Sequence, residues 1–357
     1  LGSLEKDREQ TLINSFAIEF AKDASQEYGM PSEAIQLVGK TNAAASEKGM
    51  KFNTEYARHL DKTSESYKML DAQEMKDLTG IDYYINGLWT PGTAILQPAL
   101  YIQSLADGVS KNSNVTIYEN SPVISLEEEG RHDGQKTWKA KTNLGSISSP
   151  KIILAVNGIV ERFGYFQNRL MTIFTYSSLT RELTTDESNT LGGSNEWGLT
   201  SADAMGSSVR RISGMGGNRI LVRNRWSYNP SMEASDSFMS SASDSHNESF
   251  KARFPMLDKV SMEYSWGGRL CLSLNNVFAQ GEVDDGIYSA CCQNGLGTAK
   301  GTAIGIITAE KISGENTSLI PNFADEELPK KLMPKPLMWI GVNSYMRWKE
   351  LLAGKEK

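Results

Sequence analysis

A glycine-rich turn at Asn294 to Gly301 (NGLGTAKG) is the segment whose residues most directly suggest chemistry. It follows an apolar stretch with the pattern of a strand and precedes Thr302 to Ile312, which has the pattern of a helix. Glycines at such a turn let the backbone approach a ligand closely, and the start of a helix offers unpaired amides. The turn can therefore hold an anion or a polarised carbonyl. A plain strand-to-helix connection is the alternative.

A second candidate is the end of the apolar run Lys151 to Val156 (KIILAV), which leads directly into Asn157 and Gly158. The continuous apolar pattern predicts a strand covered on both faces. Open α/β folds bind nucleotides at the carboxyl ends of such strands. An ordinary turn at the end of a strand is the alternative interpretation.

Composition excludes several classes of function. The chain has 357 residues, with 37 Lys and Arg against 43 Asp and Glu and a net charge of −6. This acidic balance argues against nucleic acid and against an anionic membrane surface as partners. No apolar run approaches the roughly 18 residues that span a bilayer, and no secretory signal pattern opens the sequence, so we expect a cytoplasmic protein.

Neither metal binding nor a disulfide framework is indicated. Cys271, Cys291 and Cys292 are too few for a framework and suit a reducing compartment. The histidines lie far apart in the sequence, and we interpret each as a solvated or capping side chain: His59, His132 and His246.

The elements that position these residues follow from periodicity. Apolar residues at helical spacing predict helices at Glu5 to Tyr28, Asn42 to His59, Ala72 to Leu78 and Ala99 to Val109. Short β-rich runs between turns predict strands at Val115 to Glu119, Val123 to Leu126, Trp138 to Thr142 and Lys151 to Val156. The Ser-rich stretch Ser231 to Ser249 predicts a loop that leads to a surface helix ending at Pro255.

A second β-rich region occupies the middle of the chain. Alternating or β-rich patterns predict strands at Ile173 to Leu179, Ser208 to Ile212, Arg219 to Arg223, Met262 to Leu274 and Gly286 to Cys292. The glycine cluster at Gly214 to Gly217 precedes one of these strands and is best interpreted as a β-turn.

In their order along the chain these elements resemble the flavin-dependent amine and amino-acid oxidoreductases related to D-amino acid oxidase, glycine oxidase and sarcosine oxidase. Within that family the motifs are most similar to the γ-glutamylputrescine oxidoreductase branch. The resemblance spans roughly Leu12 to Gly314. The matching stretches are Gly92 to Val109, Ile117 to Val123, Ile152 to Gly158, Ser265 to Gly281 and Ile287 to Gly305.

The resemblance implies an α/β (α+β) fold, with an incomplete FAD-binding Rossmann-like domain and an antiparallel β-sheet substrate domain. Residues 1–95 would form a helical segment and the start of the substrate domain, and residues 96–165 part of the FAD-binding domain. Residues 166–280 would form the β-rich substrate domain, 281–318 the C-terminal part of the FAD-binding domain, and 319–357 a tail.

The resemblance also implies FAD as the cofactor and a set of residues around it. Val123 matches the family valine whose backbone meets the adenine ring, and Ala155, Asn157 and Gly158 match the turn near the pyrophosphate. The turn that lies against the flavin ring and ribityl chain is matched by Gly295, Leu296, Gly297 and Thr298.

The sequence departs from the family in two places. The opening strand, GxGxxG turn and helix, with the acidic residue that follows them, are absent, so we expect Leu1 to be an internal residue of a longer flavoenzyme. Sarcosine-oxidase-like members carry a substrate-binding Lys two residues past the second glycine, where this chain has Ala299, with Lys300 one position further on. This second departure argues against recognition of a small carboxylate by the turn.

In the family interpretation the β-rich stretch Phe166 to Asn276 holds the substrate over the flavin face. A site for an amine or amino acid needs aromatic walls and, for a carboxylate, a guanidinium fork. The candidates are Tyr176, Arg210, Arg211, Arg225, Tyr228, Tyr264 and Trp266, with surface charge or core packing as the alternative for each. Strand alternation places Arg210 and Arg211 on opposite faces, so at most one points inward.

Two functions remain open. The first is FAD-dependent oxidation of a CH–NH bond of an amine or amino acid by hydride transfer, giving an imine that hydrolyses. In this interpretation Cys271 occupies the region of the cysteine that links to flavin in sarcosine-oxidase-like members, with buried packing as the alternative. The second is a truncated, cofactor-free interaction or regulatory protein derived from such an enzyme. The coding sequence upstream of Leu1 discriminates between them, because an in-frame GxGxxG supports the first.

Overall fold

The computed structural model describes residues 4–132, 134–295, 297–315 and 327–357. Its largest element in these ranges is a sheet of eight strands in the order β14-β10-β13-β12-β11-β2-β4-β3. β11 and β2 pair in parallel, whereas β10 pairs antiparallel with β13 and β14. The strands are β2 Lys40–Ala44, β3 Lys68–Leu70, β4 Asn86–Thr90, β10 Met171–Thr180, β11 Trp197–Ser201, β12 Ser208–Ile212, β13 Arg219–Tyr228 and β14 Met262–Leu272.

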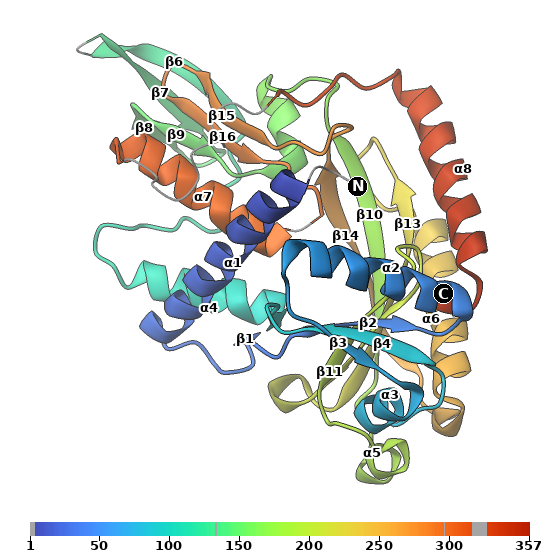
Figure 1. Ribbon diagram of the computed structural model, residues 1–357. Coiled ribbons are helices and arrows are strands. Elements are labelled where there is room, and N and C mark those ends of the chain that lie inside the picture. The colour runs from blue at the N-terminus through green and yellow to red at the C-terminus, as the bar shows by residue number, and fades with distance from the viewer. Residues whose placement is uncertain (1–3, 133, 296, 316–326) are drawn as a thin grey trace.

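Helices pack on both faces of this sheet. Figure 1 shows α6 (Asp236–Arg253) and α8 (Lys335–Ala353) beside β10 and β13, and α2 (Glu47–Thr63) near β2 and β4. The main core lies under α6, where Val209, Ile220 and Val222 meet aromatic residues that include Phe250 and Phe254. Two short helices, α3 (Ala72–Thr79) and α5 (Thr185–Leu191), close the lower end in Figure 1.

A smaller unit carries the two strand ends that the sequence singled out. β9 (Ile152–Leu154) pairs in parallel with β16 (Ile287–Cys291), which pairs antiparallel with β15 (Ala279–Asp284). Helix α7 (Gly297–Ser313) follows β16 and packs along α1 (Leu4–Glu27) (Figure 1). A separate antiparallel sheet of β6 (Ser125–His132), β7 (Gln135–Lys141) and β8 (Ser146–Ser149) lies beside this unit.

A two-stranded ribbon connects the eight-stranded sheet with the smaller unit. β1 (Ile35–Gln36) pairs with β5 (Ile95–Leu96), and helix α4 (Pro98–Ser110) begins directly after β5. Pro98 stands in the first turn of α4, where its missing N–H leaves no partner unsatisfied. Within the described residues, short turns of 3₁₀ helix occur as η1 Asn157–Phe163, η2 Gly214–Gly216, η3 Pro255–Leu257 and η5 Gly354–Glu356.

The mixed α/β fold is confirmed, but several local expectations are wrong. Val115 to Glu119 is an exposed irregular segment, with no partner strand among the described residues to pair with it. The run Asn42 to Ala45 belongs to or follows β2 rather than α2, because its small side chains are buried in the sheet: Ala43, Ala44 and Ala45 are at most 1% exposed. Here tertiary packing overrides the helix propensity of alanine.

β9 is also less covered than its apolar run predicts. Within the described residues its strand neighbour is β16 alone, and Ile153 is 46% exposed. The continuous apolar pattern predicted cover on both faces. This strand has one neighbour and one open face, so it does not need cover on both.

The Ser-rich stretch is a packed helix rather than a loop leading to a surface helix. α6 begins at Asp236, and Ala242, Ser245 and Ser249 are buried on its inner face. Small side chains let this helix approach β10 and β13 closely, which is why a run of serines suits a helix here. His246 is buried among them with 1% exposure, so its interpretation as a solvated or capping residue is wrong.

Candidate functional site

The two glycine turns predicted to meet the cofactor lie side by side at the ends of β9 and β16. Asn157, with a positive φ of 52°, accepts a hydrogen bond at its Oδ1 from the Cys292 amide over 3.1 Å. Asn294 accepts one from the Ser273 amide (2.9 Å) and donates to the Val277 carbonyl (2.9 Å). Asparagine tolerates the left-handed region and bonds to backbone, so each turn is fixed by its own side chain.

The turn before α7 is open to a ligand. Gly295 and Gly297 are exposed, and a Cβ built on Gly297 would meet no atom within 4 Å. Thr298, half-buried, follows at the start of the helix, where backbone amides have no intrahelical partner. Leu296 lies outside the described residues. Open glycines before a helix N-terminus fit the close approach of a flavin cofactor's polar atoms.

The other predicted cofactor residues differ in exposure. Ala155 is exposed, and Val123 is 42% exposed just before β6 rather than within a strand. Gly158 is buried, and a Cβ there would lie 3.6 Å from the Cys271 thiol and 3.6 Å from Thr172 Oγ1. The lack of a side chain at Gly158 therefore lets the backbone pack closely against β14 and β10. Gly158 does not face outward.

Cys271 and Lys300 both point into the protein. A hydrogen bond with the Cys292 thiol, together with burial, raises the pKa of Cys271, which is 4% exposed. Such a thiol stays protonated, which supports a packing role. Lys300 is 4% exposed, and its ammonium lies 5.3 Å from the Phe278 ring centroid.

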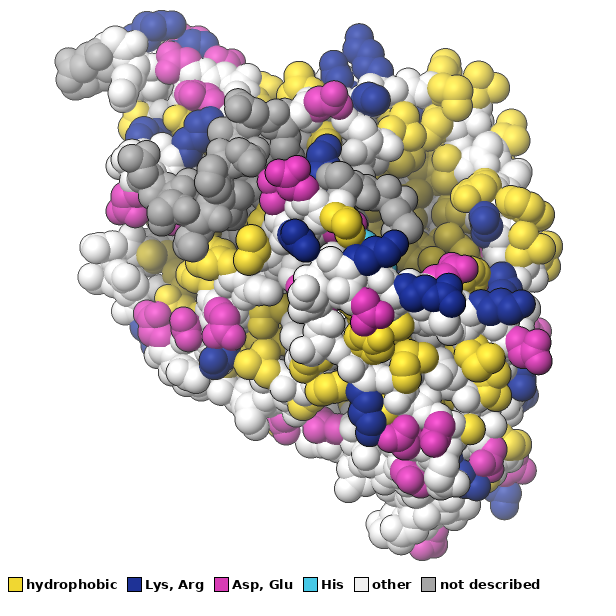
Figure 2. Space-filling view, in the orientation of Figure 1, with side chains coloured by type: hydrophobic (Ala, Val, Ile, Leu, Met, Phe, Trp, Pro, Cys, Tyr) yellow, Lys and Arg dark blue, Asp and Glu magenta, His cyan; other side chains and the backbone are white. Residues whose placement is uncertain are grey.

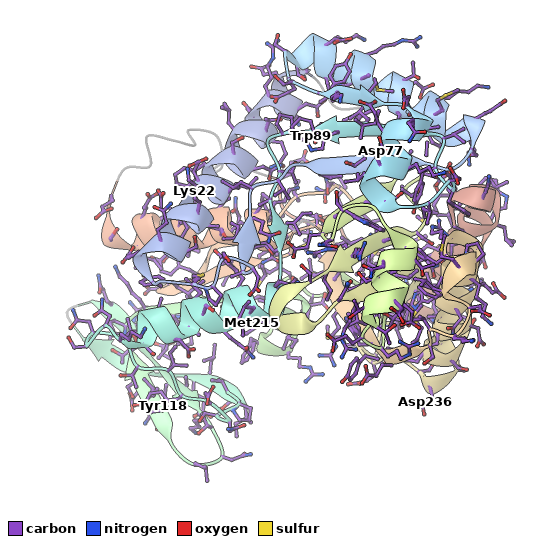
Figure 3. The ribbon with its side chains drawn as sticks, turned by 90° about the horizontal axis from the view of Figure 1, so that it is seen from below. Lys22, Asp77, Trp89, Tyr118, Met215 and Asp236 are labelled. Carbon is purple, nitrogen blue, oxygen red and sulfur yellow. The ribbon has the colours of Figure 1, made fainter. Side chains whose placement is uncertain are left out.

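A cavity of about 960 Å³ lies over the face of the large sheet opposite α6. Its walls come from β10 to β14, from β5 and from the start of α4, and Met215, which also lines it, is labelled beside α4 in Figure 3. Three cations line it: Lys40 of β2, Arg210 of β12 and Arg223 of β13. Glu33 is the carboxylate among the described lining residues, and its Oε1 accepts from the Met215 amide (3.2 Å).

Strand register brings the three cations together. Arg210 is opposite Gly198 of β11, and the parallel pairing of Leu199 with Thr41 places Gly198 beside Lys40. A Cβ on Gly198 would lie 3.5 Å from Arg210 Cγ and 3.0 Å from Ile95 Cδ1, so the Arg210 side chain crosses the space that glycine leaves. Arg223 is opposite Ser208, two residues before Arg210, which makes the two arginines diagonal neighbours.

These cations are incompletely compensated. Burial lowers the pKa of Lys40, of Arg210 and of Arg223. Arg210 donates from Nη1 to the Leu96 carbonyl (2.8 Å), but its buried Nε has no partner among the described residues. Within those residues no acceptor or carboxylate contacts the Lys40 ammonium either. Half-buried positive charge with no carboxylate partner is costly, so an anion that enters this cavity is bound favourably.

The remaining predicted substrate residues fall into two groups. Trp266 lines the cavity with Arg210, whereas Arg211 is on the opposite face, as strand alternation predicts. There the Arg211 guanidinium donates to the Gly192 carbonyl and to Ser188 Oγ, each over 2.6 Å. Arg211 is therefore part of the packing.

The other candidates do not line the cavity, and Tyr176 lies on the face of β10 opposite Ser177 and Leu179, which do. The register of β10 and β13 shifts between Thr175 and Tyr176, with Arg225 at a φ of 66°. Tyr176 is buried and bonds Ser227 Oγ (2.6 Å), and Arg225 donates to Ser241 Oγ (3.0 Å). Tyr228 is buried in another cluster, and Tyr264 is 52% exposed with the Arg219 guanidinium 5.5 Å from its ring centroid.

Sequence reasoning missed Lys40 and Arg223. Lys40 lies two residues before the segment that was predicted to be helical, so it carried no strand signal. Arg223 shares its face of β13 with Leu221, and alternation could have identified it, because Arg219 to Arg223 was predicted to be a strand.

Comparison with known proteins matches this arrangement to a family. A family model described as FAD dependent oxidoreductase (DAO) matches residues 2–311. The chain belongs to this family. The DAO-family chain is also 26% identical over 297 residues to a probable oxidoreductase, OrdL, of Haemophilus influenzae, covering 79% of this chain and 62% of that protein. It thus spans less than two thirds of the length of this relative.

Solved structures share the fold of this DAO-family chain. Glycine oxidase of Bacillus cereus aligns with a TM-score of 0.71 at 14% identity, covering 94% of this chain and 86% of that one. L-Amino acid deaminase of Proteus myxofaciens aligns with a TM-score of 0.67 at 13% identity, covering 88% and 81%. These alignments show that the fold is that of FAD-dependent oxidoreductases.

Proposed function

We propose that this chain acts in an enzyme that oxidises the CH–NH bond of an amine or amino acid bearing a carboxylate, with FAD as its cofactor. The observation that carries the proposal is the cavity in which Lys40, Arg210 and Arg223 converge. A carboxylate is the common anion of amino acids and suits a guanidinium whose Nε has no other partner. Membership of an FAD-dependent family supports the cofactor.

The roles of the residues follow from charge and burial. Arg210 lies between Lys40 and Arg223 along the sheet and would bind the carboxylate, while Leu179, Leu221 and Trp266 supply apolar walls that exclude water. The positive charges disfavour a protonated substrate amine nearby, and the neutral amine is the form from which a hydride leaves readily. FAD, when bound, supplies the hydride acceptor, and the imine product then hydrolyses in water.

The cofactor would lie against the two strand-end turns. Asn157 and the glycines Gly295 and Gly297 hold these turns open, and Leu272 beside Gly295 belongs to the same strand as Trp266. Six residues of extended strand span about 20 Å, which separates the turn from this wall of the cavity. The turn and the cavity can therefore belong to one site only if a long cofactor extends from the turn to the cavity wall.

The test uses protein produced from the complete coding sequence and a panel of matched substrates. We expect the protein to bind FAD, seen as flavin absorbance that stays with the protein on gel filtration. We expect amino acids or carboxylated amines to bleach the flavin without oxygen, and their decarboxylated analogues to do so far more slowly. Absence of FAD binding would support the cofactor-free alternative. Equal rates with and without a carboxylate would overturn the role of the cations.

A further inference from the structure

Helix α8 presents a large apolar face that no described residue covers. Six apolar side chains spaced three to five residues apart, or adjacent, share one side of the helix, and each is at least 50% exposed: Leu337, Ile340, Tyr345, Trp348, Leu351 and Leu352. The opposite side packs on the protein, with Met338 and Met346 buried against Tyr228. Contiguous exposed apolar surface of this kind marks an interaction site.

The face belongs to a firmly docked helix. Asn343 accepts from the Tyr228 amide (2.9 Å) and donates to the Tyr228 carbonyl (3.0 Å), so α8 is bonded to β13 at mid-length. Glu350, 2% exposed, accepts from the Trp226 amide (3.0 Å). The apolar face is therefore preformed.

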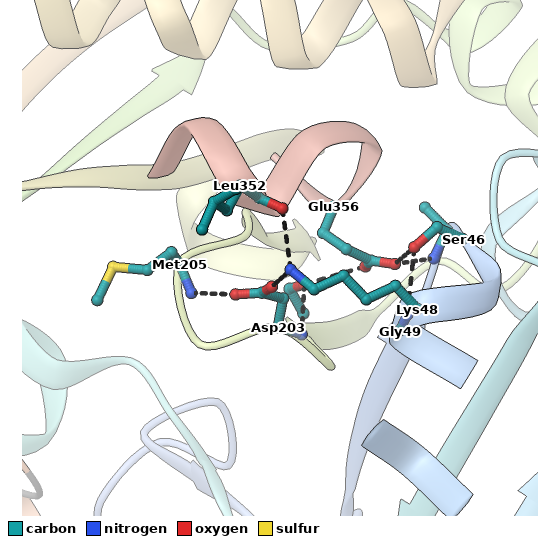
Figure 4. Close-up of polar contacts among 9 residues, drawn as sticks. Ser46, Lys48, Gly49, Asp203, Met205, Leu352 and Glu356 are labelled. Carbon is teal, nitrogen blue, oxygen red and sulfur yellow. Dashed lines mark hydrogen bonds and ion pairs between the residues drawn. The ribbon is translucent and has the colours of Figure 1, made fainter. Parts of the chain in front are cut away.

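The end of α8 is also anchored, to the start of α2 and to the turn after β11 (Figure 4). Lys48 donates to the Leu352 carbonyl (2.9 Å) and pairs with Asp203 (2.8 Å). Glu356, which follows the helix and is 1% exposed, accepts from Ser46 Oγ (2.6 Å). These contacts hold the helix in place along its full length.

In the segment from 330 to 357 the exposed side-chain charges are of one sign. The residues from 330 to 357 include two carboxylates, Glu350 and Glu356, and both are buried. The cations of the same segment are at least partly exposed: Lys330, Lys331, Lys335, Arg347, Lys349, Lys355 and Lys357. The Lys349 ammonium lies 5.7 Å from the Tyr345 ring centroid and 5.3 Å from that of Trp348, at the border of the face.

Figure 2 shows hydrophobic side chains gathered at the upper right, where Figure 1 places α8, with Lys and Arg side chains beside them. Apolar and aromatic residues bordered by cations are the composition of helices that lie in the interface of an anionic bilayer. Lysine stems extend along apolar surface while their ammonium groups reach the phosphates. The described residues include no helix that is long and apolar enough to cross a membrane.

We propose that α8 docks this protein on the surface of an anionic membrane, with its apolar face among the lipid headgroups and the surrounding Lys and Arg on lipid phosphates. The net charge of −6 that argued against such a surface is an average over the chain, whereas the residues from 330 to 357 carry exposed cations. Attraction falls off within about 10 Å at ordinary salt, so this local charge decides the contact. The proposal is independent of the oxidoreductase activity.

The experiment is flotation of the full protein with vesicles of phosphatidylcholine alone or with phosphatidylglycerol. We expect flotation with the anionic vesicles, weakened by salt, and none with neutral vesicles. The double variant Trp348→Ser and Leu351→Ser removes apolar side chains, and Lys335→Gln with Lys349→Gln removes two charges; each should weaken binding on the order of tenfold or more. All these positions lie outside the core, so circular dichroism should remain unchanged.

A matched control replaces residues of the same kinds elsewhere. Leu144, 94% exposed at the β7–β8 turn, and Lys111, exposed after α4, supply Leu144→Ser and Lys111→Gln, which should float like the wild type. Absence of flotation at low salt, or equal loss in the control, would overturn the proposal. So would a wild type that self-associates through this face on gel filtration without binding vesicles, because the occupant would then be a second copy of the chain.

Discussion

His246 makes the stability of this protein depend on pH in a way that can be calculated. The ring is 1% exposed; Nδ1 shares a hydrogen bond with Ser178 Oγ (2.7 Å), and Nε2 faces the backbone of Asn224 (3.3 Å to its carbonyl). Burial lowers the pKa of His246 from 6.5 to about 4. The folded protein therefore keeps this imidazole neutral at pH values where an unfolded chain protonates it.

The sign follows from proton binding in the two states. Above pH 6.5 the ring is neutral in both states and contributes no pH dependence. Between pH 6.5 and about 4 the unfolded chain binds the extra proton, so stability is lost as pH falls, and the loss levels off below about 4. At about 1.4 kcal/mol per pKa unit the full loss is about 3 kcal/mol, of which roughly 2 kcal/mol has occurred by pH 5.

The assay is urea denaturation at pH 7.5 and pH 5.0 of the wild type, of His246→Gln and of His59→Gln. We expect His246→Gln to be less stable at pH 7.5, because it disturbs the Ser178 contact. Between the two pH values it should lose roughly 2 kcal/mol less than the wild type. His59→Gln, a control on α2, retains the buried histidine and so should lose as much as the wild type. Equal losses for wild type and His246→Gln would refute the reasoning.

Further predictions concern the cavity and the turns. Arg210→Met should raise the KM for carboxylated substrates on the order of tenfold to a hundredfold in steady-state kinetics, because the guanidinium that would bind the carboxylate is removed. Arg211→Met, its neighbour on the opposite face, should lower the free energy of unfolding by about 3 kcal/mol, because it leaves the Gly192 carbonyl unpaired, and steady-state kinetics should show an unaltered KM. Gly198→Val should block substrate binding in titrations while flavin absorbance is retained, since its Cβ would meet Ile95 at 3.0 Å. Asn157→Ala should weaken FAD retention on dialysis, because the bond to the Cys292 amide and the left-handed φ are both disfavoured.

Local pattern predicted much of the cofactor side of the site. A strand ending at Asn157 and another followed by Gly295 and Gly297 are signals within a dozen residues each, and the structure has both turns, adjacent to one another. The order of these motifs also identified the family. The two turns can be predicted from the sequence because backbone conformation at a tight turn depends on the residues of the turn itself.

The substrate side was predicted only in part, because it depends on contacts between distant segments. Alternation along β12 separated Arg210 from Arg211, but it could not show that Lys40, some 170 residues earlier, joins Arg210 across Gly198. A bulge at Arg225 of β13 shifts its register against β10 by one residue, and Tyr176 of β10 is a core residue on the face opposite Ser177 and Leu179 of the cavity. A single-residue register shift reverses the face of every side chain beyond it, and the local pattern did not indicate where one would occur.

The sequence by itself determined the family, the fold class and the two strand-end turns, because those depend on short motifs in a fixed order. The tertiary structure alone decided which cations converge in the cavity, that His246 is buried neutral, and that α8 exposes an apolar face bordered by positive charge. Burial and charge pairing are properties of neighbours in space. Strand register and helix docking bring those neighbours together from segments that no local pattern connects.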